Sequence, residues 1–99
     1  MTLVRWTEQA VEDLRSIRLF IERDSPRYGR MVAERLFDAT EQITLFPRAG
    51  RVVPDLGQES VRELIVGEYR IVYRVEEEAA VILTVFRSSR LFPFERVRD

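Results

Sequence analysis

Arginines at defined positions between residues 61 and 90 are the side chains most able to bind an anionic partner. Arg70 and Arg74 are four residues apart, so on a strand they point to the same face. Arg87 and Arg90 flank two serines after the last apolar run. Guanidinium groups bind phosphates and carboxylates in a fixed, two-pronged geometry. This segment is therefore the first candidate for contact with a nucleic acid or an acidic protein surface.

Each pair of arginines also has a purely structural interpretation. Arg70 and Arg74 could form cross-strand ion pairs with nearby glutamates, and such pairs contribute less than about 1 kcal/mol when exposed. Arg87 and Arg90 could simply be the solvated end of a strand. At this point both interpretations stay open for all four side chains.

The amino acids that are absent narrow the possible chemistry. The chain has no His and no Cys, and all 16 of its basic residues are Arg. Histidine is the commonest general base near neutral pH, whereas Arg stays protonated there. A His-based triad, a Lys Schiff base and a His/Cys metal site are therefore excluded. We expect no metal ion and no cofactor.

Length and charge indicate one small domain. The 99 residues are 45% hydrophobic and 33% charged, which suits a single globular core. The formal net charge of −1 is unusual for a protein that depends on many phosphate contacts. No apolar run approaches the ~20 residues of a membrane span, and the first ten residues lack the features of a signal peptide. We therefore expect a cytoplasmic protein without membrane contact.

A strand and an amphipathic helix are predicted near the N-terminus. Residues 3–6 are apolar enough for an edge strand, and Thr7 is a suitable helix N-cap. Apolar residues then recur at helical spacing over about residues 8–23, and we expect charged residues such as Asp13 on the other faces. The apolar stripe comprises Ala10, Val11, Leu14, Ile17, Phe20 and Ile21.

A second helix is predicted after a clear boundary. Ser25 is a preferred N-cap residue, and Pro26 suits the first helical position because its φ is preset and it has no N–H. Apolar residues follow at steps of three and four as far as Phe46, and a proline comes next. We expect a helix over about residues 26–46, so that the two helices form an antiparallel hairpin over about residues 8–46.

The second half of the chain is typical of a β-meander over about residues 61–87. Gly67 falls at the first position of a two-residue turn, as a type II′ turn prefers. Residues 69–75 alternate, with Tyr69, Ile71, Tyr73 and Val75 on one face. The run 81–86 is nearly all apolar, which indicates a central strand. A short strand near residue 51 could precede the meander.

The order of these elements defines the expected fold class. It is an α+β domain over residues 1–99, with the N-terminal helical hairpin packed on one face of a small antiparallel β-sheet. The other face of the sheet is expected to be exposed. Residues 91–99 form a C-terminal tail.

Several short motifs occur in a fixed order along the chain. They are W-T-x-x-A-x-x-D-L at 6–14, S-P at 25–26, F-P-x-x-G-R at 46–51, R-E-L at 62–64 and Y-R-I-V-Y-R-V at 69–75. Together they resemble the RelE/ParE toxins of bacterial type II toxin–antitoxin systems over nearly the whole chain, and more closely the ParE-like members. The resemblance implies a cognate antitoxin whose flexible C-terminal segment folds on the toxin, in a higher-order hetero-oligomer.

The resembled family contains two activities. RelE-like members are ribosome-dependent mRNA endonucleases, whereas ParE-like members poison DNA gyrase. For a nuclease, the resemblance gives catalytic roles to Arg70 and Arg90, which would stabilise charge on a phosphorane. A carboxylate such as Glu63 or Glu59 would then have to be the proton acceptor. The chain lacks the lysines and the terminal Tyr or His that the nucleases use.

We therefore predict a growth-arresting toxin, neutralised by its antitoxin, that inhibits DNA gyrase without being an enzyme. The alternative is a RelE-like ribosome-dependent mRNA endonuclease, and a third possibility is a module that has lost toxicity and only binds its antitoxin. The predicted target contacts are Arg62, Arg74, Arg87, Arg90 and Phe92.

Overall fold

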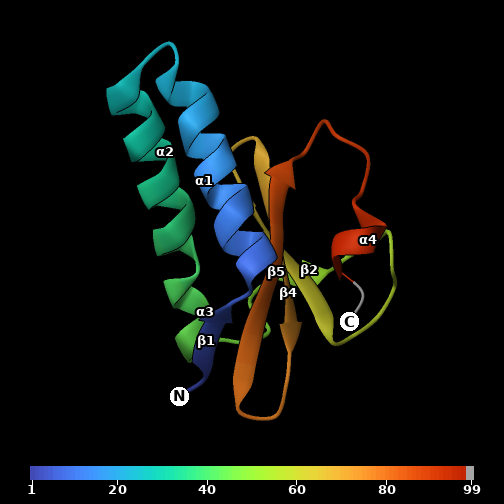
Figure 1. Ribbon diagram of the computed structural model, residues 1–99. Helices are drawn as coiled ribbons and strands as arrows, with labels where there is room; N and C mark the ends of the chain where they lie inside the picture. Colours follow the sequence, from blue (N-terminus) through green and yellow to red (C-terminus); the bar gives the residue numbers. More distant parts are fainter. Residues whose placement is uncertain (98–99) are drawn as a thin grey trace.

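The computed structural model describes residues 1–97 and arranges them around a five-stranded sheet of order β1-β5-β4-β3-β2. The strands are β1 (Leu3–Trp6), β2 (Arg51–Val52), β3 (Val61–Val66), β4 (Tyr69–Val75) and β5 (Ala79–Arg87). The helices are α1 (Glu8–Glu22), α2 (Pro26–Ala39), α3 (Glu41–Leu45) and α4 (Phe94–Val97). Figure 1 shows α1 and α2 on one side of the sheet and α4 on the other. The predicted α+β class is confirmed.

The sheet is mixed, because its first strand runs parallel to its neighbour. β3, β4 and β5 form the predicted antiparallel meander. β1 pairs with β5 in parallel, with Leu3 opposite Ala79 and Trp6 opposite Ile82. Parallel pairing needs a long connection, which the helical hairpin and the rest of the meander supply. A wholly antiparallel sheet, as predicted, is thus wrong for this one edge, and β5 is central as expected.

Side-chain caps begin both long helices where the sequence predicts them. The Thr7 hydroxyl accepts a hydrogen bond from the backbone N of Ala10 at 3.1 Å. The Ser25 hydroxyl accepts one from the backbone N of Tyr28 at 3.3 Å. Each cap satisfies a donor that would otherwise lack a partner at the start of a helix. The helical hairpin is therefore determined largely by local sequence.

The predicted second helix is interrupted at Thr40. The Thr40 hydroxyl donates to the carbonyl oxygen of Phe37 at 2.7 Å, and its backbone N donates to the same oxygen at 3.1 Å. The last turn of α2 therefore tightens to three-residue spacing and ends there. α3 is a separate short helix, and Phe46 beyond it is 66% exposed instead of extending the apolar stripe.

The main core lies between the helical hairpin and the sheet. Its buried members are Ala10, Val32, Leu36, Ile43, Leu64, Ile71, Tyr73, Ala80, Ile82 and Val85. Val11 and Phe20 were included in the predicted stripe but are 53% and 61% exposed. Val11 follows the buried Ala10 and Phe20 precedes the partly buried Ile21, and one residue is a rotation of about 100° around a helix. They lie at the margin of the hairpin, where a partner can reach them.

A second, smaller core covers the opposite face of the sheet, which the sequence predicts to be exposed. Its buried members are Val53, Val61, Val72, Val81, Leu83, Phe86 and Val97. Leu56 from the loop before β3 and Phe92 from the C-terminal segment pack against them. The predicted tail is therefore part of the fold as far as residue 97, and residues 98–99 lie outside the described residues. Figure 1 shows α4 over this face.

Gly50 lets the loop after α3 approach the sheet closely. A Cβ at this position would lie 2.6 Å from the carbonyl oxygen of Glu63 and 2.7 Å from the hydroxyl oxygen of Tyr73. That hydroxyl accepts a hydrogen bond from the backbone N of Gly50 at 2.9 Å and donates to the carbonyl oxygen of Pro47 at 2.8 Å. Burial raises the pKa of Tyr73, which keeps the hydroxyl protonated for both bonds.

Two further properties concern residues 1–97 as a whole. None of their helices is both long enough and apolar enough to cross a membrane. They also contain no group of three His, Cys, Asp or Glu side chains arranged to hold a metal ion.

Candidate functional site

Arg70 on β4 is the centre of a charged network on the sheet face opposite the helical hairpin. Its Nε donates to Oε1 of Glu63 at 2.6 Å, and its Nη2 donates to Oδ1 of Asp55 at 2.7 Å. The guanidinium carbon lies 5.1 Å from the ring centre of Phe86 and 5.3 Å from that of Phe92. Only 13% of the side chain is exposed. Arg70 therefore connects the sheet, the loop before β3 and the C-terminal segment.

Glu63 on β3 is enclosed between two arginines. Its side chain has no exposed surface, and its Oε2 accepts from Nε of Arg51 at 2.7 Å while Oε1 accepts from Arg70. Both carboxylate oxygens are therefore occupied by guanidinium groups within the fold. The structure thus brings the predicted Arg70 and Glu63 together, but as a buried ion pair.

The network also changes the ionisation of its members. The hydrogen bond from Arg70 lowers the pKa of Asp55 below its ordinary value of 3.8. Burial disfavours the charge on Arg70, but the bonds to Asp55 and Glu63 outweigh it and raise the pKa of Arg70. Arg70 is consequently a permanent cation whose charge is compensated within the fold.

Arg62 and Arg74 also make contacts within the fold. Nη1 of Arg62 donates to the carbonyl oxygen of Gly50 at 3.2 Å, and Nη2 donates to Oε2 of Glu59 at 2.8 Å. Nε of Arg74 donates to Oε2 of Glu76 at 3.1 Å. Arg74 thus forms an ion pair with a glutamate just past the end of its own strand, whereas the predicted cross-strand pairing is made by Arg70 with Glu63 on β3. A part for Arg62 or Arg74 in target contact stays a prediction.

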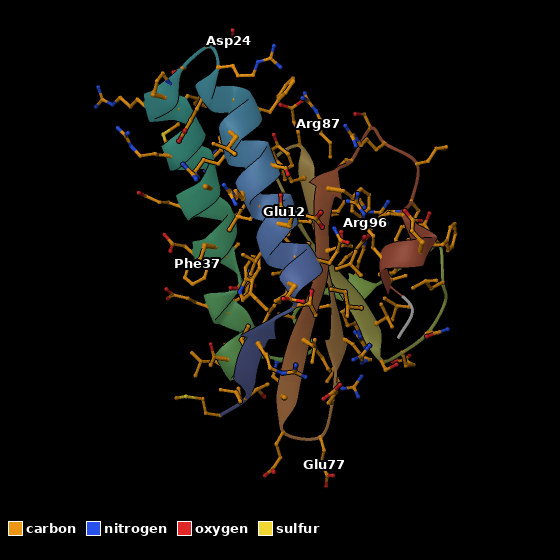
Figure 2. All side chains as sticks on the ribbon, viewed as in Figure 1. Glu12, Asp24, Phe37, Glu77, Arg87 and Arg96 are labelled. Atoms are coloured by element: carbon orange, nitrogen blue, oxygen red, sulfur yellow. The ribbon has the colours of Figure 1, made fainter. Side chains whose placement is uncertain are left out.

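Arg87 is the last residue of β5 and Arg90 follows shortly after it, both at the surface, and Figure 2 shows Arg87 at the opposite end of this strand from Glu77. Arg87 is 46% exposed at its side chain and pairs with Oε1 of Glu68 at 2.9 Å. Arg90 is exposed and makes no side-chain hydrogen bond or ion pair with any other residue of 1–97. The adjacent Leu91 is 94% exposed. This end of the molecule is a cationic and apolar surface open to a partner.

Asp13 is a buried anchor that the sequence wrongly places on a solvent-facing side of α1. Its Oδ2 accepts hydrogen bonds from the hydroxyl of Thr84 and from the backbone N of Val85. Its Oδ1 accepts from Nη1 of Arg96 at 2.9 Å, and Figure 2 shows Arg96 between α4 and the sheet. A carboxylate is buried only when such partners are present. The only sequence signal was the aspartate of the W-T-x-x-A-x-x-D-L motif.

Comparisons with known proteins identify the family. A family model described as the ParE toxin of the type II toxin–antitoxin system parDE matches residues 4–92. The chain belongs to the ParE toxin family. The toxin RelE2 of Caulobacter vibrioides is 34% identical over 92 residues, which cover 92% of this chain and all of that protein. Y4kP of Sinorhizobium fredii, whose name describes a candidate toxin, is 32% identical over 91% of this chain and 92% of its own.

Two solved structures resemble this ParE-family chain. A chain of the chromosomal ParDE toxin–antitoxin system from P. aeruginosa has a TM-score of 0.74 at 20% identity, covers 88% of this chain, and shows the likeness of fold. A chain of the toxin–antitoxin complex RelBE2 from Mycobacterium tuberculosis has a TM-score of 0.56 at 26% identity and covers 87%. In each case 96% of the other chain is covered. The protein is a type II toxin with both ParE-named and RelE-named relatives, so its target has to be proposed from the site.

Proposed function

We propose that this ParE-family toxin arrests growth by binding DNA gyrase and does not cleave RNA. The observation that carries the proposal is the enclosure of Arg70 and Glu63, of which Arg70 is 13% exposed and Glu63 has no exposed side-chain surface. Cleavage of RNA needs a reachable acceptor for the 2′-hydroxyl proton and a donor for the leaving oxygen. The enclosed pair offers neither, and the chain has no His, Lys or Cys to replace it.

The surface that would contact gyrase lies at the end of β5. Arg87 and Arg90 present guanidinium groups there, and the exposed Leu91 follows Arg90 directly in the chain. Charged groups beside apolar ones give an interface both orientation and buried area. Phe92, in contrast, packs inward on Phe86, with ring centres 5.7 Å apart, and would support this surface from below.

A cognate antitoxin would hold the toxin inactive by covering it. Support comes from the two solved relatives, which are described as toxin–antitoxin assemblies. The helical hairpin exposes Val11, Leu19, Met31 and Phe37 by 45% or more, an apolar surface that a partner segment can bury. We expect a complex with several copies of both proteins.

A supercoiling assay tests the proposal directly. Relaxed plasmid, gyrase and ATP are combined with increasing amounts of the purified toxin, and we expect supercoiling to stop. Arg90→Glu should raise by about tenfold the toxin concentration that stops supercoiling. The change replaces an attractive contact, worth about 1.4 kcal/mol or more, with a charge of the same sign as the acidic surface that Arg90 would face. Arg30→Glu, the same change at another exposed arginine on α2, is the matched control. Full supercoiling at a large excess of toxin would refute the proposal.

Ribosome-dependent cleavage of mRNA is the second candidate function. The relative named RelE2, which is 34% identical to this chain, favours it. It requires the C-terminal segment to leave Arg70 when the toxin enters the ribosome, since Phe92 packs on the guanidinium. Purified toxin with translating ribosomes would then cut the message, and Arg70→Ala would abolish cutting without unfolding the chain.

A further inference from the structure

A cavity of about 430 Å³ adjoins the end of β5. α1 forms one wall, and β5 with the C-terminal segment forms the others. Its lining includes the apolar side chains of Ile17, Phe20, Val85 and Phe86 and the guanidinium groups of Arg87, Arg90 and Arg96. Ligand sites in proteins have this character: they are mostly apolar, with a few convergent polar groups and a volume of about 300–1,000 Å³.

The three cations of this cavity are not equally available. Arg96 is neutralised by the buried Asp13 at 2.9 Å. Arg87 pairs at 2.9 Å with Glu68, but both partners are largely exposed, so this pair is weak and exchangeable. Arg90 has no hydrogen bond or ion pair from its side chain anywhere in residues 1–97. One positive charge therefore stands uncompensated at the cavity, in a chain whose formal net charge is −1.

The apolar wall provides the second half of a recognition site. Phe20 is 61% exposed on the side of α1 that lines the cavity, and Ile17 lies one turn before it. An apolar group placed against them would remove this surface from water, which stabilises a complex by roughly 25 cal/mol per Å². A guanidinium next to such a wall would bind a carboxylate through a charge-assisted, two-pronged hydrogen bond.

We infer that this cavity binds a peptide segment in which an apolar side chain is followed by a side-chain carboxylate. The apolar side chain lies against Phe20 and Ile17, and the carboxylate accepts hydrogen bonds from Arg90, with Arg87 joining when it releases Glu68. Charge complementarity selects this occupant over a nucleic acid. Among the arginines that line the cavity, a polyphosphate backbone would find only Arg90 uncommitted, and it would approach Glu68, whose side chain is 71% exposed. The inference does not depend on gyrase being the target.

Titration of the folded, ¹⁵N-labelled chain with blocked dipeptides tests the inference. The probes are acetyl-Leu-Glu-amide and its neutral isostere acetyl-Leu-Gln-amide, followed by backbone amide NMR signals. We expect shifts in residues 16–20 and 86–90, with the glutamate probe binding about tenfold more tightly, the factor that one charge-assisted hydrogen bond supplies. A thymidine dinucleotide with a 5′-phosphate serves as the nucleic-acid probe and should bind more weakly than the glutamate dipeptide.

Single substitutions test the cationic part and the apolar wall of the site separately. Arg90→Gln should weaken the glutamate probe about tenfold and leave the glutamine probe unchanged, since only the charge-assisted bond is lost. Phe20→Ser should weaken both probes by a similar factor. Arg30→Gln on α2 is the matched control and should change neither. Arg90 and Arg30 are exposed and Phe20 is mostly so, and the NMR spectrum itself verifies the fold of each variant.

Three results would overturn the inference. They are equal affinity for the two dipeptides, shifts that avoid both walls of the cavity, and tighter binding of the dinucleotide. A chain that ignores the dipeptides yet stops gyrase would refute this site and leave the proposed function standing. A chain that binds the glutamate dipeptide through Arg90 but leaves gyrase active would support this site and refute the proposed function.

Discussion

The Nε atom of Arg70 lies 2.6 Å from Oε1 of Glu63 and joins β4 to β3 beneath the C-terminal segment. The two residues are diagonal neighbours in the sheet, because Glu63 is opposite Val72 and Arg70 is opposite Ile65. In sequence they are the most plausible pair of catalytic groups. In the structure the two charges neutralise each other. The other carboxylate oxygen of Glu63 binds Arg51, and the guanidinium of Arg70 also binds Asp55.

Replacing Arg70 with Met tests whether this pair supports the fold. Glu63 would stay buried with Arg51 as its one remaining cation, and Asp55 would lose its partner. We expect the free energy of unfolding to fall by about 3 kcal/mol, the lower end for a broken buried pair, because Arg70 is 13% exposed. Urea unfolding followed by Trp6 fluorescence gives the value.

The control for this change is Arg18→Met on α1. It breaks a partly exposed i,i+4 pair with Glu22 at 3.0 Å and should cost less than about 0.5 kcal/mol. Similar losses for the two variants would mean that the Arg70 network contributes nothing special to stability.

Asp55 makes the network sensitive to acid. Its pKa is lowered in the folded chain because Arg70 donates to it, from an ordinary value of 3.8. Such a group stabilises the fold above the unfolded pKa, and the contribution disappears as the pH falls through the folded pKa. The stability advantage of the wild type over Asp55→Asn should therefore be constant above about pH 5 and shrink below about pH 4. Urea unfolding midpoints of both proteins measure this across the pH range. If the wild type kept its stability advantage in acid, the stabilising role of ionised Asp55 would be contradicted.

Asp13 should control the attachment of the C-terminal segment. Asp13→Ala removes the acceptor of Thr84, Val85 and Arg96, so we expect a loss of about 3 kcal/mol and faster amide exchange over residues 92–97. Hydrogen–deuterium exchange with mass spectrometry measures the second effect. Arg96→Gln, the milder comparison, should loosen the same residues and cost under about 1 kcal/mol, because Arg96 is 36% exposed. Unchanged exchange in Asp13→Ala would mean that apolar packing alone holds the segment.

Tyr73→Phe should show how strongly the loop after α3 is held. The change leaves the backbone N of Gly50 and the carbonyl oxygen of Pro47 without the hydroxyl that joins them. We expect a loss of about 1–3 kcal/mol in the free energy of unfolding. Tyr69→Phe is the matched control, since the Tyr69 hydroxyl makes no hydrogen bond within residues 1–97 and its loss should be near zero. A Tyr73 variant as stable as that control would remove this role.

Helix caps, tight turns and strand alternation depend on local sequence and could be predicted from it. Thr7 and Ser25 cap their helices, and Gly67 has the positive φ of 57° that the predicted turn requires. The alternation of β4 correctly separates Ile71 and Tyr73 from Val72, which lies in the second core. Each of these depends on neighbours within a few residues, which a sequence pattern records directly.

Features that join distant parts of the chain were missed. Besides the nearby Gln9, the carboxylate of Asp13 has partners 71 to 83 positions away, and β1 pairs in parallel with the last strand of the meander. The residue types of Arg70 and Glu63 indicate a candidate site, but Arg70 is covered only because Phe92 returns over the sheet. The spacing of apolar residues within a helix or strand does not indicate that a distant segment folds back over the sheet.

Mapping the 5′ ends of cellular mRNA after this toxin alone is induced in bacteria tests the central claim most directly. The enclosed Arg70–Glu63 pair predicts growth arrest with intact messages, accompanied by filamentous cells and a DNA-damage response. New 5′ ends at codon-phased positions on translated messages would contradict the account. They would make the toxin a ribosome-dependent nuclease and return Arg70 to the centre of an active site.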